Sequence, residues 1–190
     1  MKKNVLAILL TTSFCGASFA TELPSTNLVG LELSTYSLLS AKPSNVLDIA
    51  SKLNYEQLNN KLLKLGYSIS HEKSQMTNNQ FLYKVEKNSK EQVSMIPKTF
   101  SLGYNVNISN IESIGNQHLF DFSSNVRSLE NKDDSLFNGS SVQSPSILIN
   151  SYEKYNVWLN EKNNYMFVYS TQSQIFDGRY STTIFVVSTK

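Results

Sequence analysis

The sequence predicts an α+β domain made mainly of antiparallel β-sheet in long hairpins, with one helical segment near the N-terminus. Apolar residues recur at three- and four-residue steps between residues 46 and 65, which is typical of one face of a helix. Most later segments alternate between apolar and polar residues, as half-buried strands do. A run of strands after one helical stretch, without regular alternation of strands and helices, favours an antiparallel sheet.

The first twenty residues have the pattern of a signal peptide. Lys2 and Lys3 form a basic start, residues 5–10 are apolar, and residues 18–20 (Ser-Phe-Ala) place small side chains where signal peptidase needs them. The apolar stretch is too short to span a bilayer, which argues against a permanent anchor. We therefore expect residues 1–20 to be a cleaved signal peptide and residues 21–190 to form a single exported, β-rich domain.

The expected mature chain is electrically balanced and lacks cysteine. The full chain has 17 basic and 15 acidic side chains, and loss of Lys2 and Lys3 makes these numbers equal. A neutral chain has no bulk attraction for nucleic acid, so we expect no nucleic-acid partner. The single cysteine, Cys15, lies within the signal peptide. Stability must therefore come from core burial or from assembly with partners rather than from disulfides.

The N-terminal part of the domain is predicted to contain a strand followed by the helical segment. Alternating apolar residues predict a strand over residues 29–39. Asn54, with Gln57 three residues later, resembles a second helix N-cap, so residues 46–65 are either two short helices or one kinked helix. Gly66 is expected to end the helix.

Everything after the helix reads as β-structure. Short strands are predicted at residues 67–70 and 81–85, and the clearest strand is residues 100–108, where the alternation is uninterrupted. A turn at residues 113–116, containing Gly115, then leads into a hairpin partner with His118, Phe120 and Phe122 on one face.

The last third is predicted to contain a long loop and two further hairpins. Residues 128–146 have little apolar periodicity, which indicates a loop of about twenty residues of the kind that is often functional or mobile. Alternation on either side of the polar residues 160–164 predicts a hairpin. Asp177-Gly178 predicts a type I′ turn before a final strand at residues 180–188.

Residues for catalysis, metal binding or cofactor binding are scarce. The chain offers only His71 and His118, neither beside a nucleophile-elbow glycine pattern. His118 is in phase with Phe120 and Phe122, so it is interpreted as a structural histidine, and His71 as a surface residue. Asp133-Asp134 is interpreted as part of a solvated loop rather than a cation site. The sequence thus predicts no catalytic residues, no metal, no cofactor and a non-enzymatic protein, although an exported hydrolase remains an alternative.

One aromatic residue stands out as a candidate for binding a partner. The strand patterns place six residues on core faces: Tyr155, Val157, Leu159, Tyr165, Phe167 and Tyr169. Trp158 is out of phase with its neighbours and is therefore expected on the opposite, exposed face. This makes Trp158 the possible partner-binding residue.

Several segments resemble the core domain of bacterial secretins, the ring-forming outer-membrane channels of secretion systems and type IV pili. In chain order, these segments are residues 29–33 (VGLEL), 62–66 (LLKLG), 76–80 (MTNNQ), 102–108 (LGYNVNI), 118–122 (HLFDF), 144–145 (SP), 156–159 (NVWL) and 165–168 (YMFV). The sequence departs from the family at residues 160–163, where Asp-Gly is usual, and at residues 168–171, where a double glycine is usual. The family's N-terminal ring domains and conventional C-terminal end are absent from the sequence.

The resemblance implies a component or accessory of an envelope secretion or type IV pilus apparatus that acts by strand pairing and assembly. Its location would be the periplasm or outer membrane of a Gram-negative bacterium. Its partners would be protein components of the cell envelope, a larger channel or further copies of itself. The alternative is a free periplasmic or secreted binding module, adhesin-like or inhibitor-like, that uses residues 128–146 as its contact loop.

Signal-peptide cleavage gives the first prediction. The exported protein should begin at Thr21, because Ala20 follows the small-residue pattern that signal peptidase reads. N-terminal sequencing of the exported protein checks this. Detection of Met1 at the N-terminus would contradict it.

Overall fold

The computed structural model of the chain describes residues 30–45, 50, 52–86, 93–137, 140–160, 166–175 and 178–189. For residues 82–86, 93–96, 131–137 and 140–145 it describes the backbone alone. The predicted signal peptide lies outside the described residues. In chain order the elements are β1 (Leu31–Ser40), α2 (Tyr55–Lys64), β2 (Ser68–Ser70), β3 (Ser74–Glu86), β4 (Val93–Ile114), β5 (Gln117–Phe137), β6 (Ser140–Asn160), β7 (Met166–Gln174) and β8 (Tyr180–Thr189).

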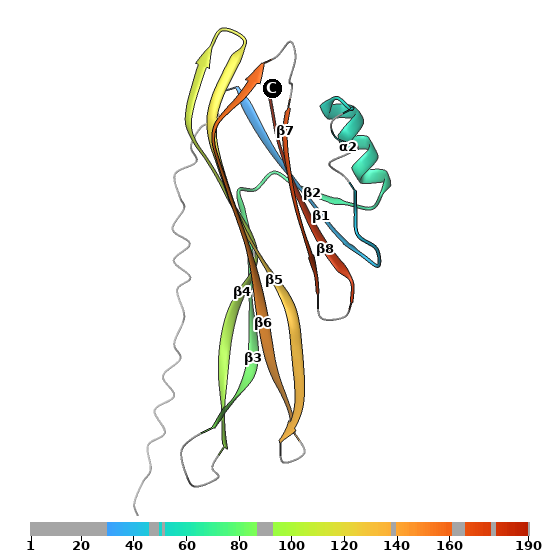
Figure 1. The fold of residues 1–190 in the computed structure, drawn as a ribbon, viewed down its shortest axis with the longest axis vertical. Coiled ribbons are helices and arrows are strands. Elements are labelled where there is room, and N and C mark those ends of the chain that lie inside the picture. Colours follow the sequence, from blue (N-terminus) through green and yellow to red (C-terminus); the bar gives the residue numbers. More distant parts are fainter. Residues whose placement is uncertain are drawn as a thin grey trace, which may run out of the picture.

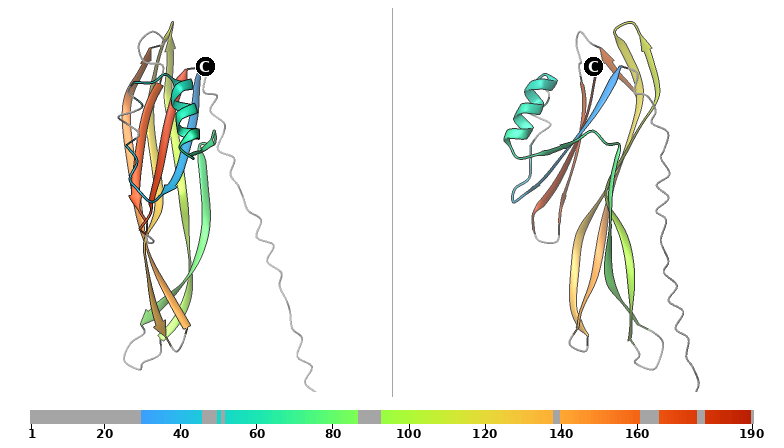
Figure 2. Two further views of the ribbon diagram at one scale, coloured as in Figure 1. Left: turned by 90° about the vertical axis from the view of Figure 1, so that its right-hand side faces the viewer. Right: turned by 180° about the vertical axis from the view of Figure 1, so that it is seen from behind.

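The described strands form two antiparallel sheets, which confirms the predicted predominance of antiparallel β-structure. The short sheet has the order β2-β1-β8-β7 and the long sheet the order β3-β4-β5-β6. The short sheet packs on the upper half of the long sheet, and α2 covers the other face of the short sheet (Figure 1). The upper half of the molecule is therefore a body of three layers, from which the long sheet projects downward (Figure 2).

The main core lies between the two sheets, where the predicted alternation holds on both sides. β1 and β8 contribute Leu31, Leu33, Phe185 and Val187, and the long sheet contributes Tyr104, Val106, Ile108, Phe120, Phe122, Val126, Val157 and Leu159. Phe122 lies at the centre, with ring centroids of Phe167 at 5.0 Å and Phe185 at 5.9 Å. The predicted core face of residues 100–108 is confirmed by the burial of Tyr104, Val106 and Ile108.

A second core lies between the short sheet and α2. Tyr36, Ile184 and Val186, on the opposite face of β1 and β8, pack against Leu58 and Leu62 of the helix. β8 is therefore buried on both faces, which explains why Ile184 to Val187 form a continuous apolar run rather than alternating with polar residues.

The ends of α2 match the sequence prediction. The Asn54 side chain accepts a hydrogen bond from the Gln57 backbone N–H, and the Gln57 side chain accepts one from the Asn54 backbone N–H, so a capping box begins the helix. Gly66 has a φ of +89° just after the C-cap, a conformation that glycine adopts without strain. Of the earlier helical residues, Val46 to Ile49 and Ser51 lie outside the described part.

The long loop predicted at residues 128–146 is wrong. Residues 128–137 continue β5 and residues 140–149 belong to β6, paired from Ser128↔Leu148 to Phe137↔Ser140. These strands extend below the short sheet (Figure 1). Their sequence lacks the apolar alternation that is typical of strands with one face against the short sheet, and so they were not recognised as strands. Asn138-Gly139, whose residues lie outside the described part, is the pair typical of a two-residue hairpin turn.

The hairpin predicted around residues 160–164 is also wrong. β6 pairs with β5 in the long sheet, whereas β7 pairs with β8 in the short sheet. The chain therefore passes from one sheet to the other between these strands. A polar break between two alternating segments marks a change of direction, but it does not say whether the second strand pairs with the first or faces it across the core.

The final hairpin is confirmed. β7 and β8 pair from Met166↔Ser188 to Gln174↔Tyr180. At its end the Gly178 N–H donates to the Ile175 carbonyl at 2.9 Å, and Gly178 has a φ of +80°, which glycine adopts without strain. Asp177, the other residue of the predicted type I′ turn, lies outside the described residues.

The long sheet divides at Gly103. In the described residues the β4–β5 ladder ends at the pair Gly103↔Arg127, and below it β3–β4 and β5–β6 continue as two separate two-stranded arms. Gly103 has a φ of +130°, and a Cβ there would lie 1.9 Å from the carbonyl oxygen of Gln75. Only glycine lets β3 approach β4 this closely at the point of division.

Gly103 gives the second prediction. Gly103→Ala should lower the free energy of unfolding by several kcal/mol, because it adds a backbone clash to the strain of a positive φ. Gly115→Ala is the matched control, since Gly115 has a φ of +60° but no atom within 4 Å of the added Cβ. The control should cost only about 1–2 kcal/mol. Urea denaturation of both variants checks this, and equal losses would contradict the close approach.

Candidate functional site

Trp158 lies on the outer face of the long sheet, as the sequence predicts. It belongs to β6, an edge strand, and its side chain is 52% exposed. Its neighbours Val157 and Leu159 are buried between the sheets. In the register across the sheet, Trp158 lies opposite Leu119 of β5, which lies opposite Glu112 of β4, so these three side chains share the outer face.

Two β-bulges flank this part of the long sheet, one on each side of β5. On β4, Asn110 and Ile111 interrupt the register between Ser109 and Glu112. On β6, Tyr155 and Asn156 stand opposite a single residue of β5, Asp121. Both bulges contain an asparagine with positive φ, Asn110 at 51° and Asn156 at 54°. Asparagine is the non-glycine residue that best tolerates this conformation.

The carboxylate of Asp121 holds both bulges. Its Oδ1 accepts a hydrogen bond from the backbone N–H of Asn156 at 2.8 Å, and its Oδ2 accepts one from the side-chain amide of Asn110 at 2.6 Å. These two donors favour the ionised form and hold the pKa of Asp121 below its ordinary value. One side chain of the middle strand thus fixes an irregularity in each of its neighbours.

The bulge in β6 explains why the predicted core position of Tyr155 is wrong. The extra residue shifts the alternation, so Tyr155 is 65% exposed and donates a hydrogen bond to Glu153 at 2.7 Å. That hydrogen bond to a carboxylate, together with the negative charge, raises the pKa of Tyr155. Phe167 and Tyr169 do pack against the core as predicted, while Tyr165 lies outside the described residues.

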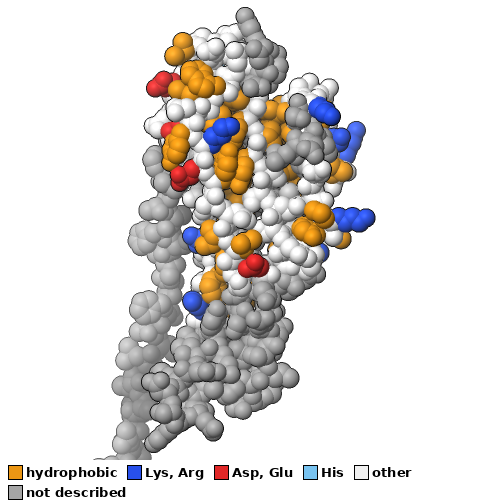
Figure 3. Space-filling model, in the orientation of Figure 1, with side chains coloured by type: hydrophobic (Ala, Val, Ile, Leu, Met, Phe, Trp, Pro, Cys, Tyr) orange, Lys and Arg blue, Asp and Glu red, His pale blue; other side chains and the backbone are white. Residues whose placement is uncertain are grey.

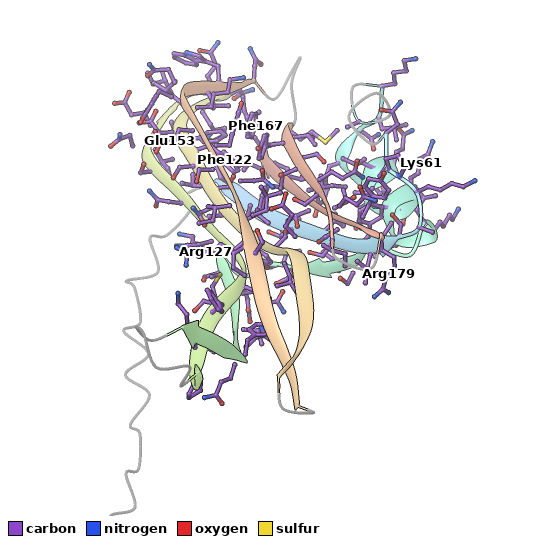
Figure 4. The ribbon with its side chains drawn as sticks, turned by 60° about the horizontal axis from the view of Figure 1, so that its bottom comes forward. Lys61, Phe122, Arg127, Glu153, Phe167 and Arg179 are labelled. Carbon is purple, nitrogen blue, oxygen red and sulfur yellow. The ribbon has the colours of Figure 1, made fainter. Side chains whose placement is uncertain are left out.

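The two bulges and their surroundings form an exposed surface of aromatic, aliphatic and acidic side chains, which we call the double-bulge face. It consists of Glu112, Ile114, Leu119, Asp121, Glu153, Tyr155 and Trp158. Figure 4 shows Glu153 at the outer surface, whereas Phe122 and Phe167 lie between the sheets. Lys154 is turned away from this face, with its Nζ 5.3 Å from the ring centre of Phe167.

Asp121, Asn110 and Asn156 were not predicted from the sequence as site residues. A signal for the first bulge is present, since the apolar spacing changes from two residues, between Tyr104 and Ile108, to three, between Ile108 and Ile111. Such a change of phase within a strand indicates an inserted residue. The sequence alone does not reveal that one carboxylate satisfies both bulges.

A serine, a histidine and a carboxylate also come together at the edge of the short sheet, without the geometry of a catalytic relay. The Nδ1 of His71 lies 3.3 Å from Ser34 Oγ, 3.2 Å from the Leu33 carbonyl oxygen and 3.7 Å from Glu32 Oε1. In a catalytic triad the serine and the carboxylate contact different ring nitrogens, whereas here all contacts converge on one. The Ser34 side chain is also fully buried.

Both histidines occupy the positions expected from the sequence. His71 has 57% of its side chain exposed. His118 is buried and lies 2.9 Å from the Ser113 hydroxyl through its Nδ1, on the same face as Phe120 and Phe122. Among the described residues, no group of three or more histidine, cysteine, aspartate or glutamate side chains is placed to hold a metal ion. No helix in the described part has the length and apolar character needed to cross a membrane.

A cleft of about 520 Å³ opens where the short sheet ends and the long sheet continues. Its apolar lining comes from Leu38, Leu39, Leu102, Tyr104, Val126 and Leu129. Arg127 also borders it, but its guanidinium donates to Asn125 on the outer face. The cleft therefore has a largely uncharged interior.

Comparison with known proteins gives no relative: no protein-family model, no curated protein and no solved structure matches the chain.

Asp121 gives the third prediction. Asp121→Asn should lower the free energy of unfolding at pH 7. The new side-chain amide has only one oxygen, so its NH₂ group would face either the Asn156 N–H or the Asn110 amide and leave that donor without an acceptor. Folding lowers the pKa of Asp121. Its contribution to the free energy of unfolding is therefore complete above the pKa of the unfolded chain, about 4, and is lost as the pH falls through the lower pKa of the folded protein. The stability difference between wild type and variant should therefore shrink towards pH 2.

Urea denaturation across this pH range measures the difference. Glu72→Gln is the control, since it removes an exposed carboxylate on the connection between β2 and β3, away from both bulges. A difference that stays constant with pH would contradict the role assigned to the ionised carboxylate.

Proposed function

We propose that the protein is a non-enzymatic, exported component or accessory of an envelope secretion or type IV pilus apparatus, and that it acts by pairing strands of its long sheet with a neighbouring copy or channel. The observation that carries this proposal is the pair of open edges that the long sheet presents in its arms below Gly103. The edge strands β3 and β6 each pair with one neighbour only in the described ladders. Exposed strand edges are templates for pairing with another chain.

The direction of the strands suits repeated addition of copies. With four antiparallel strands in the order β3-β4-β5-β6, the two edge strands run in opposite directions. A neighbour in the same orientation would therefore bring its β3 antiparallel to β6 and continue the same sheet. Such a head-to-tail contact generates a ring when the rotation between copies closes.

The bulges interrupt the outer strands of the body. Above Gly103, β4 and β6 both carry a bulge, at Asn110 and at Tyr155-Asn156. A bulge disrupts the regular row of edge hydrogen-bonding groups and is one way in which proteins protect sheet edges. In the arms the register shifts on the inner strand β5, between Leu129 and Asn131, rather than on the outer strands β3 and β6.

The fourth prediction tests edge pairing by crosslinking. After removal of Cys15 the mature chain has no cysteine, so Gln80→Cys on β3 and Ser146→Cys on β6 each introduce a unique thiol at an exposed position. When the two single variants are mixed, one of them tagged, a bis-maleimide should give mixed dimers, because β3 of one copy lies beside β6 of the next. Separate variants exclude crosslinks within one chain, which matters because β3 and β6 also approach each other in the monomer.

Lys42→Cys, in the exposed segment after β1, is the control and should give few mixed dimers with either variant. Failure to obtain mixed dimers, together with a protein that sediments as a monomer at high concentration, would contradict assembly through the long sheet.

The second candidate is a free periplasmic or secreted binding module. Residues 128–137 and 140–146 are strands rather than the predicted contact loop. The cleft between the sheets supports this candidate independently, because a concave site lined by apolar and hydroxyl side chains suits a small ligand. This candidate predicts that the wild-type protein is monomeric and binds an apolar fluorescent probe. Loss of probe binding in Leu129→Asp, which places a charge in the lining of the cleft, would favour it.

A further inference from the structure

Two exposed surfaces of the body have opposite charge, and each contains exposed apolar side chains. The double-bulge face carries three carboxylates, those of Glu112, Asp121 and Glu153, around Ile114 and Trp158, which are 67% and 52% exposed. The second surface, which we call the α2 face, consists of Lys61, Lys64 and Leu65, exposed residues spaced three and four positions apart on one side of the helix. Leu65 is 51% exposed. Exposed apolar groups bordered by charge are typical of interaction sites.

The two surfaces lie on opposite sides of the body and do not meet within one chain. α2 covers the outer face of the short sheet, whereas the double-bulge face is the outer face of the long sheet (Figure 2). In Figure 3 acidic side chains lie at the outer edge of the upper long sheet and several Lys and Arg side chains lie on the side of α2, while other basic side chains lie towards the long sheet. The opposite charges would therefore meet only between two molecules.

We propose that the double-bulge face of one copy binds the α2 face of a second copy. This inference rests on the proposed assembly function and adds to it a face-to-face contact that does not involve the strand edges. The lysines Lys61 and Lys64 meet the carboxylates of Glu112 and Glu153, and Leu65 packs against Trp158 and Ile114. A lysine over the indole of Trp158 adds a cation–π attraction.

The contact is heterologous, because each surface belongs to a different side of the molecule. A copy bound through its α2 face keeps its own double-bulge face available, so the contact can be repeated along a row of copies. Its electrostatic part should be salt-sensitive, since the Debye length falls to about 3 Å at 1 M salt. The apolar part keeps the two faces together at physiological ionic strength.

Trp158 is the only tryptophan of the chain and serves as an internal probe. In the monomer its half-exposed indole should emit at long wavelength. As the protein concentration rises, binding of an α2 face should shift this emission to shorter wavelength, in parallel with association measured by sedimentation. Trp158→Ala should remain folded by circular dichroism and associate about tenfold more weakly, because it removes the largest exposed side chain of the face.

A charge-swap experiment identifies the partner surface. Glu112→Lys/Glu153→Lys makes the double-bulge face basic, and Lys61→Glu/Lys64→Glu makes the α2 face acidic. Each double variant alone should associate about tenfold or more weakly than wild type, because like charges now meet. A mixture of the two should recover association, because every contact between unlike variants again joins opposite charges. Glu72→Lys, an exposed charge reversal outside both surfaces, is the control and should behave like wild type.

The outcomes separate this inference from the assembly function on which it rests. A mixture that associates no better than either variant, or a Trp158 emission that stays constant while the protein associates, overturns the face-to-face contact. If mixed dimers still form between Gln80→Cys and Ser146→Cys in that case, the assembly function stands without it. A wild-type protein that remains monomeric throughout overturns both.

Discussion

The upper half of the long sheet depends on the two hydrogen bonds accepted by the carboxylate of Asp121. They join the Asn156 backbone N–H on one neighbouring strand to the Asn110 side chain on the other. Asn110 and Asn156 both have a positive φ, and each lies where the ladder to β5 is interrupted; both features cost folding free energy. The hydrogen bonds to the Asp121 carboxylate offset part of this cost. With these hydrogen bonds, both edge strands bend at the same level, and Tyr155 is turned outward beside Trp158.

What could be predicted from the sequence follows the distribution of buried faces. Strands that line the main core, such as the one containing Tyr104, Val106 and Ile108, alternate because one face must exclude water. α2 could be recognised from its capping box and its terminal glycine, which are local signals. The arms extend beyond the short sheet, and their serines and asparagines carry no periodic signal. Residues 128–146 were therefore predicted as a loop, although their backbone continues two strands.

The remaining differences arise where local pattern does not determine the partner of a strand. Val157 and Leu159 on β6 and Phe167 and Tyr169 on β7 were expected to be neighbours in one sheet. They instead face each other across the main core, from different sheets. Both arrangements place these four residues in the core, so their core positions were predicted correctly while the topology was not. Likewise, Trp158 could be placed from its phase relative to Val157, but Tyr155 could not, because the bulge between them depends on Asp121 of another strand.

The structure thus combines two kinds of surface with different recognition properties. Pairing along the arms would use backbone groups, which any extended strand can supply, so it brings little selectivity of its own. The double-bulge face, by contrast, displays a particular set of aromatic and acidic side chains at positions fixed by Asp121. A chain that relied on open edges alone would risk unspecific aggregation. The two bulges on the body interrupt the edge hydrogen-bonding groups there and, through the same change in alternation, turn Tyr155 outward. They thereby create the double-bulge face through which we propose that one copy selects another.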